Sequence, residues 1–267
     1  MSPDEPTLQD RGAAIARAFD GEAERYERFE NHPSARMMRQ AVHRAYERYL
    51  RPGGSVLDLN CGPGPDLPFF QSLGMRVTAI DISMEMLEKA RMRNPEANLL
   101  HMDFNDLDRL DRRFDAICSN FGGLNTQPGF EAFADSCWQR LNLRGFLIIN
   151  IMTRIPLPEI AEGLLRGRHF FRRLRHGGHQ ELKVGNRILK TWYFHPGAFY
   201  RLYFRQRFEL LEIRGLGVFL PPAYFPPPPR LLIRTAGFLD RALGGWFPFN
   251  RLGDHALLVM RARAARS

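Results

Sequence analysis

The sequence predicts a single α/β domain built on a doubly wound parallel sheet. Short apolar runs alternate with helical patterns along the first 152 residues, which favours strand–helix–strand units in one sheet. The first run, Ser55 to Leu59, leads directly into a glycine turn at 60–64, and a helical pattern follows. The next two runs end in Asp81 and Asp103. Because the carboxyl ends of parallel strands meet at one edge, this turn and these carboxylates should form one site.

Seven strands are expected. The parallel strands cover residues 55–59, 76–80, 98–102, 114–121 and 143–152, and an antiparallel C-terminal pair covers 208–220 and 256–262. This is a Rossmann-like sheet with an inserted cap between strands five and six and a proline-rich segment between strands six and seven. Within residues 1–267 we predict an N-terminal helical lid (11–50), a core (51–152), the inserted cap (153–207) and the C-terminal strands with the proline and aromatic segment (208–267).

The composition is that of a globular protein with a sizeable core, since 44% of the 267 residues are hydrophobic. Cys61, Cys118 and Cys137 form no Cys-x-x-Cys pair, which predicts small buried thiols in a reducing, cytoplasmic setting. A run of 18 apolar residues is absent from the sequence, which argues against a membrane-spanning helix. No His, Cys and Asp cluster has metal-ligand spacing, so no metal site is predicted.

The net charge of +9 is unevenly placed, at −4 for residues 1–150 and +13 for residues 151–267. This asymmetry favours an acidic substrate, an anionic membrane surface or nucleic acid, without choosing among them. A predicted helix from Leu157 to Leu174 makes residues 156–175 a candidate peripheral membrane contact. The alternative interpretation is a solvated basic face over a core-facing stripe. That face carries Arg166, Arg168, Arg172, Arg173 and Arg175.

Two helices precede the sheet. Apolar residues recur at helical spacing from Gly12 to Phe29, which predicts one amphipathic helix. After the break at 31–34, Ser34 is the expected cap of a second helix that carries Met38 and Val42.

The glycine turn indicates an adenosine-bearing cofactor, and the residues around it indicate the charge of that cofactor. Dinucleotide sites usually need Gly-x-Gly-x-x-Gly, and Leu67 occupies the third position here. A pyrophosphate would also lie close to Asp58 and Asp66, a repulsive arrangement of like charges. A cofactor with a cationic centre is therefore favoured.

The run Asp58-Leu-Asn-Cys-Gly-Pro-Gly, followed by Asp81, resembles motifs I and II of class I S-adenosylmethionine (SAM) dependent methyltransferases. Residues 81–91 match the pattern Asp-x-Ser-x-x-Met-Leu-x-x-Ala-Arg that is common in this family. Asn60 departs from the family, which usually has glycine at that position, and Arg144 replaces the first glycine before strand five. Residues 18–27 are similar to the N-terminal segment of the small-molecule, quinone-biosynthesis-like branch, where this segment closes over SAM.

The resemblance implies SAM as methyl donor, S-adenosylhomocysteine as product, and a role for each matching residue. Gly62 and Gly64 would let the backbone approach the methionine moiety, and Asp58 would hold its ammonium group. Asp81 would bind both ribose hydroxyls. Asp103 would bind the adenine amino group, with Met102 or Phe104 on the ring face; the alternative is that Asp103 caps the following turn. The other implied cofactor contacts are Tyr26, Asn60, Ile82, Met86, Ser119, Asn120 and Phe121.

Residues after strand four face the sulfonium in this family, which also nominates Asn125 as a catalytic residue. Amino-directed DNA and RNA methyltransferases usually place Asp/Asn/Ser-Pro-Pro-aromatic here, and this chain does not. Nucleic acid is therefore not the favoured acceptor. Candidate general bases are His32, Tyr193 and His195, each near the predicted lid or insertion, and spacing does not rank them.

The inserted cap should contain a hairpin of residues 182–184 and 188–194, followed by a helix that starts at His195-Pro196. The proline run 221–229 precedes a predicted helix from Arg230 to Leu243. We interpret the proline run as a rigid apolar wall over the site; a surface for partners that read polyproline is the alternative.

The sequence thus predicts a methyltransferase that acts on a small or medium apolar acceptor, aromatic or polyketide- or lipid-like, at oxygen. One alternative is an RNA methyltransferase, suggested by the basic half and its aromatic residues. The other is a non-catalytic protein of the same fold that docks on a membrane or partner. The oligomeric state is not predicted.

Overall fold

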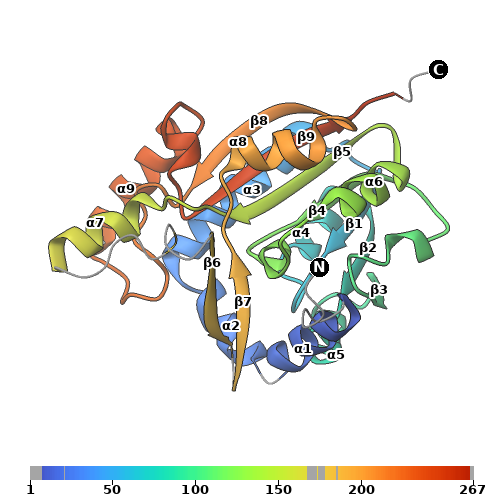
Figure 1. Ribbon diagram of the computed structural model, residues 1–267, viewed down its shortest axis with the longest axis horizontal. Helices are drawn as coiled ribbons and strands as arrows, with labels where there is room; N and C mark the ends of the chain where they lie inside the picture. Colours follow the sequence, from blue (N-terminus) through green and yellow to red (C-terminus); the bar gives the residue numbers. More distant parts are fainter. Residues whose placement is uncertain (1–7, 21, 167–172, 174–177, 185, 265–267) are drawn as a thin grey trace.

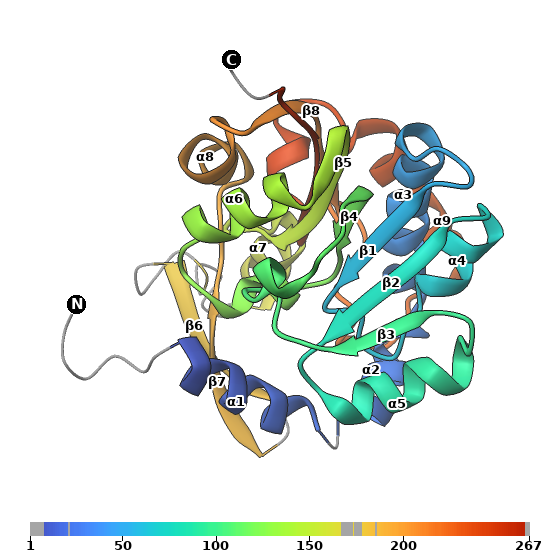
Figure 2. The same cartoon turned by 90° about the vertical axis from the view of Figure 1, so that its right-hand side faces the viewer.

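The computed structural model describes residues 8–20, 22–166, 173, 178–184 and 186–264. Its centre is a seven-stranded sheet with the order β3-β2-β1-β4-β5-β9-β8, in which the first five strands are parallel. Strand β9 runs antiparallel to both β5 and β8. The predicted Rossmann-like sheet with an antiparallel C-terminal pair is confirmed, and helices cover both of its faces (Figures 1 and 2). The sheet strands are β1 (Ser55–Leu59), β2 (Arg76–Asp81), β3 (Asn98–His101), β4 (Phe114–Ser119), β5 (Leu141–Met152), β8 (Phe208–Leu216) and β9 (His255–Ala262).

The helices before and within the core are α1 (Leu8–Phe19), α2 (Ala23–Glu30), α3 (Pro33–Tyr49), α4 (Leu67–Ser72), α5 (Met84–Arg93) and α6 (Glu131–Gln139). The later ones are α7 (Leu157–Arg166), α8 (Pro196–Phe199) with a following π-helical turn (Tyr200–Phe204), and α9 (Arg230–Leu243). A separate antiparallel hairpin joins β6 (His179–Val184) to β7 (Arg187–Trp192). Among the described residues, no helix combines the length and apolarity needed to cross a bilayer.

Two N-terminal predictions need correction. The single helix expected over residues 12–29 is two helices, since α1 ends at Phe19 and α2 begins at Ala23. The cap of α3 is His32 rather than Ser34, since the His32 Nδ1 accepts a hydrogen bond from the Ser34 amide at 3.2 Å.

Strand six ends earlier than predicted, at Leu216. Gly217 follows with a φ of 66°, and the buried Asp240 of α9 accepts hydrogen bonds from the Gly217 and Phe219 amides, both at 2.7 Å. These bonds divert the backbone from the sheet.

The basic helix expected over 157–174 is described only as α7, and its remaining arginines lie outside the described residues or have undescribed side chains. Arg173 is the exception, and it is not on a solvated face. It is 8% exposed and donates to Asp254 Oδ1 at 2.6 Å, to the Thr153 carbonyl at 3.1 Å and to Glu159. Burial lowers and the two carboxylates raise the pKa of Arg173, with a net rise, so it stays charged and ties α7 to the start of β9.

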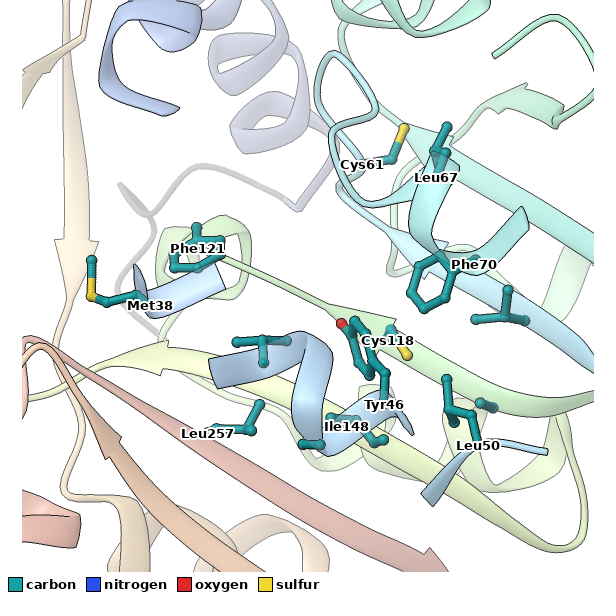
Figure 3. Packing of buried hydrophobic residues seen from close by; sticks show 14 of the residues in the cluster. Met38, Tyr46, Leu50, Cys61, Leu67, Phe70, Cys118, Phe121, Ile148 and Leu257 are labelled. Atoms are coloured by element: carbon teal, nitrogen blue, oxygen red, sulfur yellow. The ribbon is translucent and has the colours of Figure 1, made fainter. Parts of the chain in front are cut away.

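One half of the core lies between the sheet and α3. Tyr46 of α3 is fully buried, its ring centroid is 4.9 Å from that of Phe70, and it lies beside Cys118 of β4 (Figure 3). All three cysteines are free and buried, as predicted, and burial raises the pKa of each thiol. The core therefore fixes α3, and with it the N-terminal helices, against the sheet edge that carries the site.

Candidate active site

A cavity of about 230 Å³ lies at the carboxyl edge of the parallel strands. The sheet edge supplies polar side chains and backbone, α1 and α2 supply an aromatic wall, and the β6–β7 hairpin supplies aliphatic side chains. The hairpin reaches α1 beside the cavity, where the Arg11 guanidinium lies 5.9 Å from the Trp192 ring centroid (Figures 1 and 2). The lining comprises Ile15, Phe19, Tyr26, Asn60, Gly62, Asp81, Ile82, Met86, Asp103, Phe104, Asn120, Phe121, Gly122, Gly123, Thr126, Met152, Leu182, Val184, Leu189 and Thr191.

Asp81 ends β2 and is held rigidly beneath the glycine turn. Its Oδ2 accepts a hydrogen bond from the Gly62 amide at 2.8 Å, and its Oδ1 accepts one from the Ser83 amide at 2.9 Å. Ser83 also caps α5 by accepting from the Met86 amide at 3.3 Å. Burial raises the pKa of Asp81, although these amide bonds oppose the rise. Each oxygen keeps acceptor capacity, so the group can receive two hydroxyl donors of a ligand.

The turn itself needs left-handed backbone. Asn60 has a φ of 53° and Gly62 a φ of 56°. Asparagine tolerates this region better than other non-glycine residues, which explains how Asn60 replaces the usual glycine. A Cβ on Gly123 would lie 2.6 Å from the Asn60 Cβ, so the absence of a side chain at Gly123 makes room for Asn60. Gly64 lies away from the cavity, packed against Leu67 and Asn94 of the helical layer.

Beside the cavity, a smaller recess contains two buried carboxyl groups, Asp58 and Asp66, together with Arg39. Asp66 is paired with the Arg39 guanidinium at 2.5 Å and the His43 Nε2 at 2.7 Å, and it accepts from the Asn120 Nδ2 at 2.9 Å. Burial raises the pKa of Asp66, but Arg39 and His43 outweigh it and hold the pKa below its usual range. Asp66 is therefore ionised.

The pKa of Asp58 is shifted in the opposite direction. Asp58 is 2% exposed, and burial followed by the nearby Asp66 charge raises its pKa well above the usual range, with Arg39 opposing. A cationic ligand group in the recess would stabilise the ionised form of Asp58. The recess therefore contains both the Arg39 guanidinium and the Asp58 carboxyl group, whose ionised form a positively charged ligand would stabilise.

The N-terminal helices lie close over the sheet edge. Tyr26 of α2 donates to the Phe121 carbonyl at 3.4 Å, and the Arg39 guanidinium lies 4.7 Å from the Phe121 ring centroid. A Cβ on Gly12 would lie 2.9 Å from Asp103 Oδ2 and 3.0 Å from Ile82 Cδ1, so α1 approaches this carboxylate directly. Arg39 and Gly12 were not identified from the sequence. The only available signals were a helical arginine and a helical glycine, and neither pattern specifies a partner.

Most of the predicted cofactor contacts line the cavity, but some do not. Asp103 lines the cavity and also accepts from the Asn105 amide at 2.8 Å, so it both caps its turn and faces the cavity. Phe104 is on the lining, whereas Met102 is off it and packs, partly buried, against the hydrophobic cluster that also contains Phe104. Ser119 is fully buried beneath Asn60 and off the lining. The predicted contacts that line the cavity are Tyr26, Asn60, Gly62, Asp81, Ile82, Met86, Asp103, Phe104, Asn120 and Phe121.

None of the three candidate bases lines the cavity. His32 caps α3, and burial lowers its pKa. Tyr193 is buried against Arg173, whose guanidinium lies 4.6 Å from the ring centroid. His195 is exposed at the start of α8, and partial burial followed by Arg154 and Arg251 lowers its pKa.

Asn125 has a positional role. It is fully buried, accepts from the Met152 amide at 2.9 Å and donates to the Trp192 carbonyl at 2.5 Å. It therefore joins the end of β5 to the end of β7, which fixes the hairpin over the cavity. Among the described residues, no group of three His, Cys, Asp or Glu side chains could hold a metal ion.

A parallel sheet of this order, with a glycine turn after β1 and a carboxylate at the end of β2, defines a methyltransferase-type Rossmann-like fold. The comparisons with known proteins agree. Residues 56–145 match the model of a methyltransferase domain. The predicted resemblance to SAM-dependent methyltransferases is thereby confirmed.

Similar proteins include enzymes named for different acceptors. The malonyl-[acyl-carrier protein] O-methyltransferase of Pseudescherichia vulneris is 33% identical over 108 residues, which cover 40% of this chain and 41% of that protein. The demethylmenaquinone methyltransferase of Renibacterium salmoninarum is 32% identical over 84 residues, covering 32% of this chain and 35% of that protein. The matches therefore span less than half of these relatives.

Solved structures share the fold over most of the chain. The Burkholderia thailandensis 1,6-didemethyltoxoflavin-N1-methyltransferase, with bound 1,6-didemethyltoxoflavin and S-adenosylhomocysteine, superposes with a TM-score of 0.57 and 16% identity. That match covers 99% of this chain and 93% of the other. The aligned span therefore includes the N-terminal helices and the described part of the inserted cap.

Proposed function

We propose that this protein transfers a methyl group from SAM to a small or medium apolar acceptor. One observation carries the proposal: a single cavity joins the polar edge of the sheet to the aliphatic face of the β6–β7 hairpin. A polar donor and an apolar acceptor can meet in such a cavity with water excluded.

The residues fit SAM. Asp81 would accept from the ribose hydroxyls, and Asp103 with Phe104 would hold the adenine. Asp58 would face the ammonium group, and Arg39 would face the carboxylate of the methionine moiety. The buried Asp58, whose pKa is raised, is the group that a bound ammonium would stabilise most.

Methyl transfer from a sulfonium disperses charge, so alignment and exclusion of water matter more than charge stabilisation. Here α1, α2 and the hairpin exclude water, and Asn125 fixes the hairpin through Met152 and Trp192. SAM itself supplies the reactive methyl group.

Oxygen is the favoured acceptor atom. Among the described residues, the lining contains no histidine, lysine or cysteine, and its titratable groups are Tyr26, Asp81 and Asp103. Burial raises the pKa of Tyr26, which makes it a poor base at neutral pH. A phenol, enol or carboxylic acid can lose its own proton, so such acceptors suit this cavity better than groups that need a strong base. The apolar hairpin residues Leu182, Val184 and Leu189 suit an aromatic, polyketide- or lipid-like body.

Calorimetric titration with SAM tests the donor assignment. The wild-type chain should bind SAM, and Asp81→Ala should bind at least about tenfold more weakly, because hydrogen bonds to a charged group contribute about 1.5–3 kcal/mol each. Asp108→Ala, which changes an exposed aspartate, is the matched control and should bind normally. Failure of the wild type to bind, or equal binding by Asp81→Ala, would refute the site.

The RNA alternative has the basic C-terminal half in its favour. It requires RNA affinity that falls steeply with salt, whereas the proposed enzyme should show little such binding. A non-catalytic docking protein would yield no methylated product from any extract incubated with labelled SAM. These two outcomes separate the three hypotheses.

A further inference from the structure

Large apolar side chains are exposed on α9 and on the turn that follows it. The opposite face of α9 packs inward through Ile233 and Ala236, and a Cβ on Gly237 would lie 2.6 Å from the Met37 Sδ of α3. Large apolar side chains therefore lie on the solvent face of α9 as well as on its buried face. Packing against the rest of the protein explains only those on the buried face. The exposed residues are Leu231 (79% exposed), Leu232 (59%), Phe238 (58%), Trp246 (71%) and Phe247 (72%). We call these five, together with Arg230, Arg234, Arg241 and Arg251, the α9 surface.

The charge of the α9 surface has one sign. Its four arginines are exposed, and the only acidic residue between 213 and 253, Asp240, is buried and occupied by the Gly217 and Phe219 amides. The arginines flank the aromatic rings. The Arg241 guanidinium lies 5.8 Å from the Phe238 ring centroid, and that of Arg251 lies 5.2 Å from that of Phe247.

The neighbouring face of α3 adds to this charge. Burial, followed by repulsion from Arg241 and Arg214, lowers the pKa of Arg44, while Glu47 partly offsets it. The repulsion between these neighbouring arginines is reduced when an anionic surface approaches them.

We propose that the α9 surface binds an anionic lipid bilayer, with α9 lying in the plane of the membrane. Exposed Trp, Phe and Leu side chains insert at the boundary of headgroups and acyl chains, and arginines at their flanks contact lipid phosphates. The 14-residue α9 is too short to span a bilayer. This proposal places the membrane contact on α9 instead of on residues 156–175. In that segment Arg173 forms internal ion pairs with Glu159 and Asp254.

A second copy of the chain fits the α9 surface less well. A two-fold interface apposes identical patches, so arginines would face arginines with no carboxylate of the patch to separate them. Anionic lipid supplies both the apolar depth and the negative charge.

Vesicle flotation with the full chain tests the proposal. The wild type should associate with phosphatidylglycerol-containing vesicles, bind pure phosphatidylcholine vesicles less, and dissociate partly when salt is raised. Phe238→Ser/Phe247→Ser should bind at least about tenfold more weakly, because two large apolar side chains no longer insert. Leu143→Ser/Leu202→Ser removes two equally exposed leucines elsewhere and is the matched control.

Thermal unfolding and SAM titration of each variant separate lost membrane binding from lost folding. As a second readout, brominated lipid should quench tryptophan fluorescence in the wild type and less in Trp246→Phe. Absence of wild-type binding to anionic vesicles, equal loss in both double variants, or a dimer that the Phe238→Ser/Phe247→Ser change dissociates would each overturn the proposal. None of these outcomes bears on SAM binding, so the proposed function is tested separately.

Discussion

Two buried carboxyl groups beside the same glycine turn have pKa values shifted in opposite directions, and this difference is central to the site. Asp66 has a guanidinium and an imidazole within 2.7 Å, which lowers its pKa. Asp58 is buried nearby, and its pKa is raised by burial and by the Asp66 charge. Asp66 is therefore ionised and held by its partners, and in the proposed site Asp58 is the carboxyl group that would face the ammonium group of SAM.

SAM affinity should therefore depend on pH in a defined direction. The ammonium group binds the ionised form of Asp58, so affinity is full above the raised pKa of Asp58 and falls as the pH is lowered through it. Asp81, whose pKa is also raised, contributes in the same direction. The fall should be shallower in Asp58→Asn than in the wild type, as calorimetry over a pH series would measure. Parallel profiles for the two proteins would contradict the role of Asp58.

The residues at strand ends were predictable, and those that complete the site from elsewhere were not. Asp58, Asp81 and Asp103 follow from a periodic pattern in one continuous segment. Arg39 reaches Asp66 from a helix 27 positions earlier, and helical periodicity does not specify how α3 crosses the sheet. The candidate bases were chosen for chemical type and for lying near the predicted lid or insertion, and nearness in sequence does not specify which side chains face the cavity, so the structure places all three off the lining.

At the scale of elements, α1 depends on Gly12 for its approach to the sheet edge. A Cβ at this position would lie 2.9 Å from Asp103 Oδ2 and 3.0 Å from Ile82 Cδ1, so a larger side chain would fit only if these side chains or α1 moved. The apolar periodicity of the N-terminal segment predicted a helix, but the contact with Asp103 comes from tertiary packing.

Gly12→Val should lift α1 from the cofactor edge. SAM affinity should fall about tenfold, in line with the roughly 1–3 kcal/mol typical of overpacking. Ala13→Val places the same β-branched residue one position away in α1 and should bind nearly normally. Calorimetry of both variants checks this, and equal losses would mean that helix propensity, not contact, is responsible.

The cap shows a related limit of sequence prediction. The hairpin was expected at nearly its observed position, because turn residues bound its two strands. Arg173 was assigned to a solvated basic face, yet it pairs with Asp254, 81 positions away in sequence. Local pattern cannot reveal an ion pair of that separation.

At the scale of the whole molecule, the chain separates its tasks along the sequence. The acidic first half supplies the sheet edge and the N-terminal helices around the cavity, and the basic second half supplies the hairpin and the α9 surface. The parallel sheet was predictable because strands and helices alternate, and two late apolar runs indicated the β8 and β9 strands of the antiparallel pair. The chemistry of the acceptor was not, because the residues of β6 and β7 that line the cavity match no motif identified in the sequence.

The most direct test of the central claim is transfer of a labelled methyl group from SAM to organic-extractable small molecules. Wild-type protein incubated with a small-molecule extract should produce a labelled product in the organic phase, and Asp81→Ala should produce far less under the same conditions. Mass spectrometry of that product would identify the acceptor and the methylated atom. If label enters RNA instead, or if no product forms while SAM still binds, the assignment of a small apolar acceptor is contradicted.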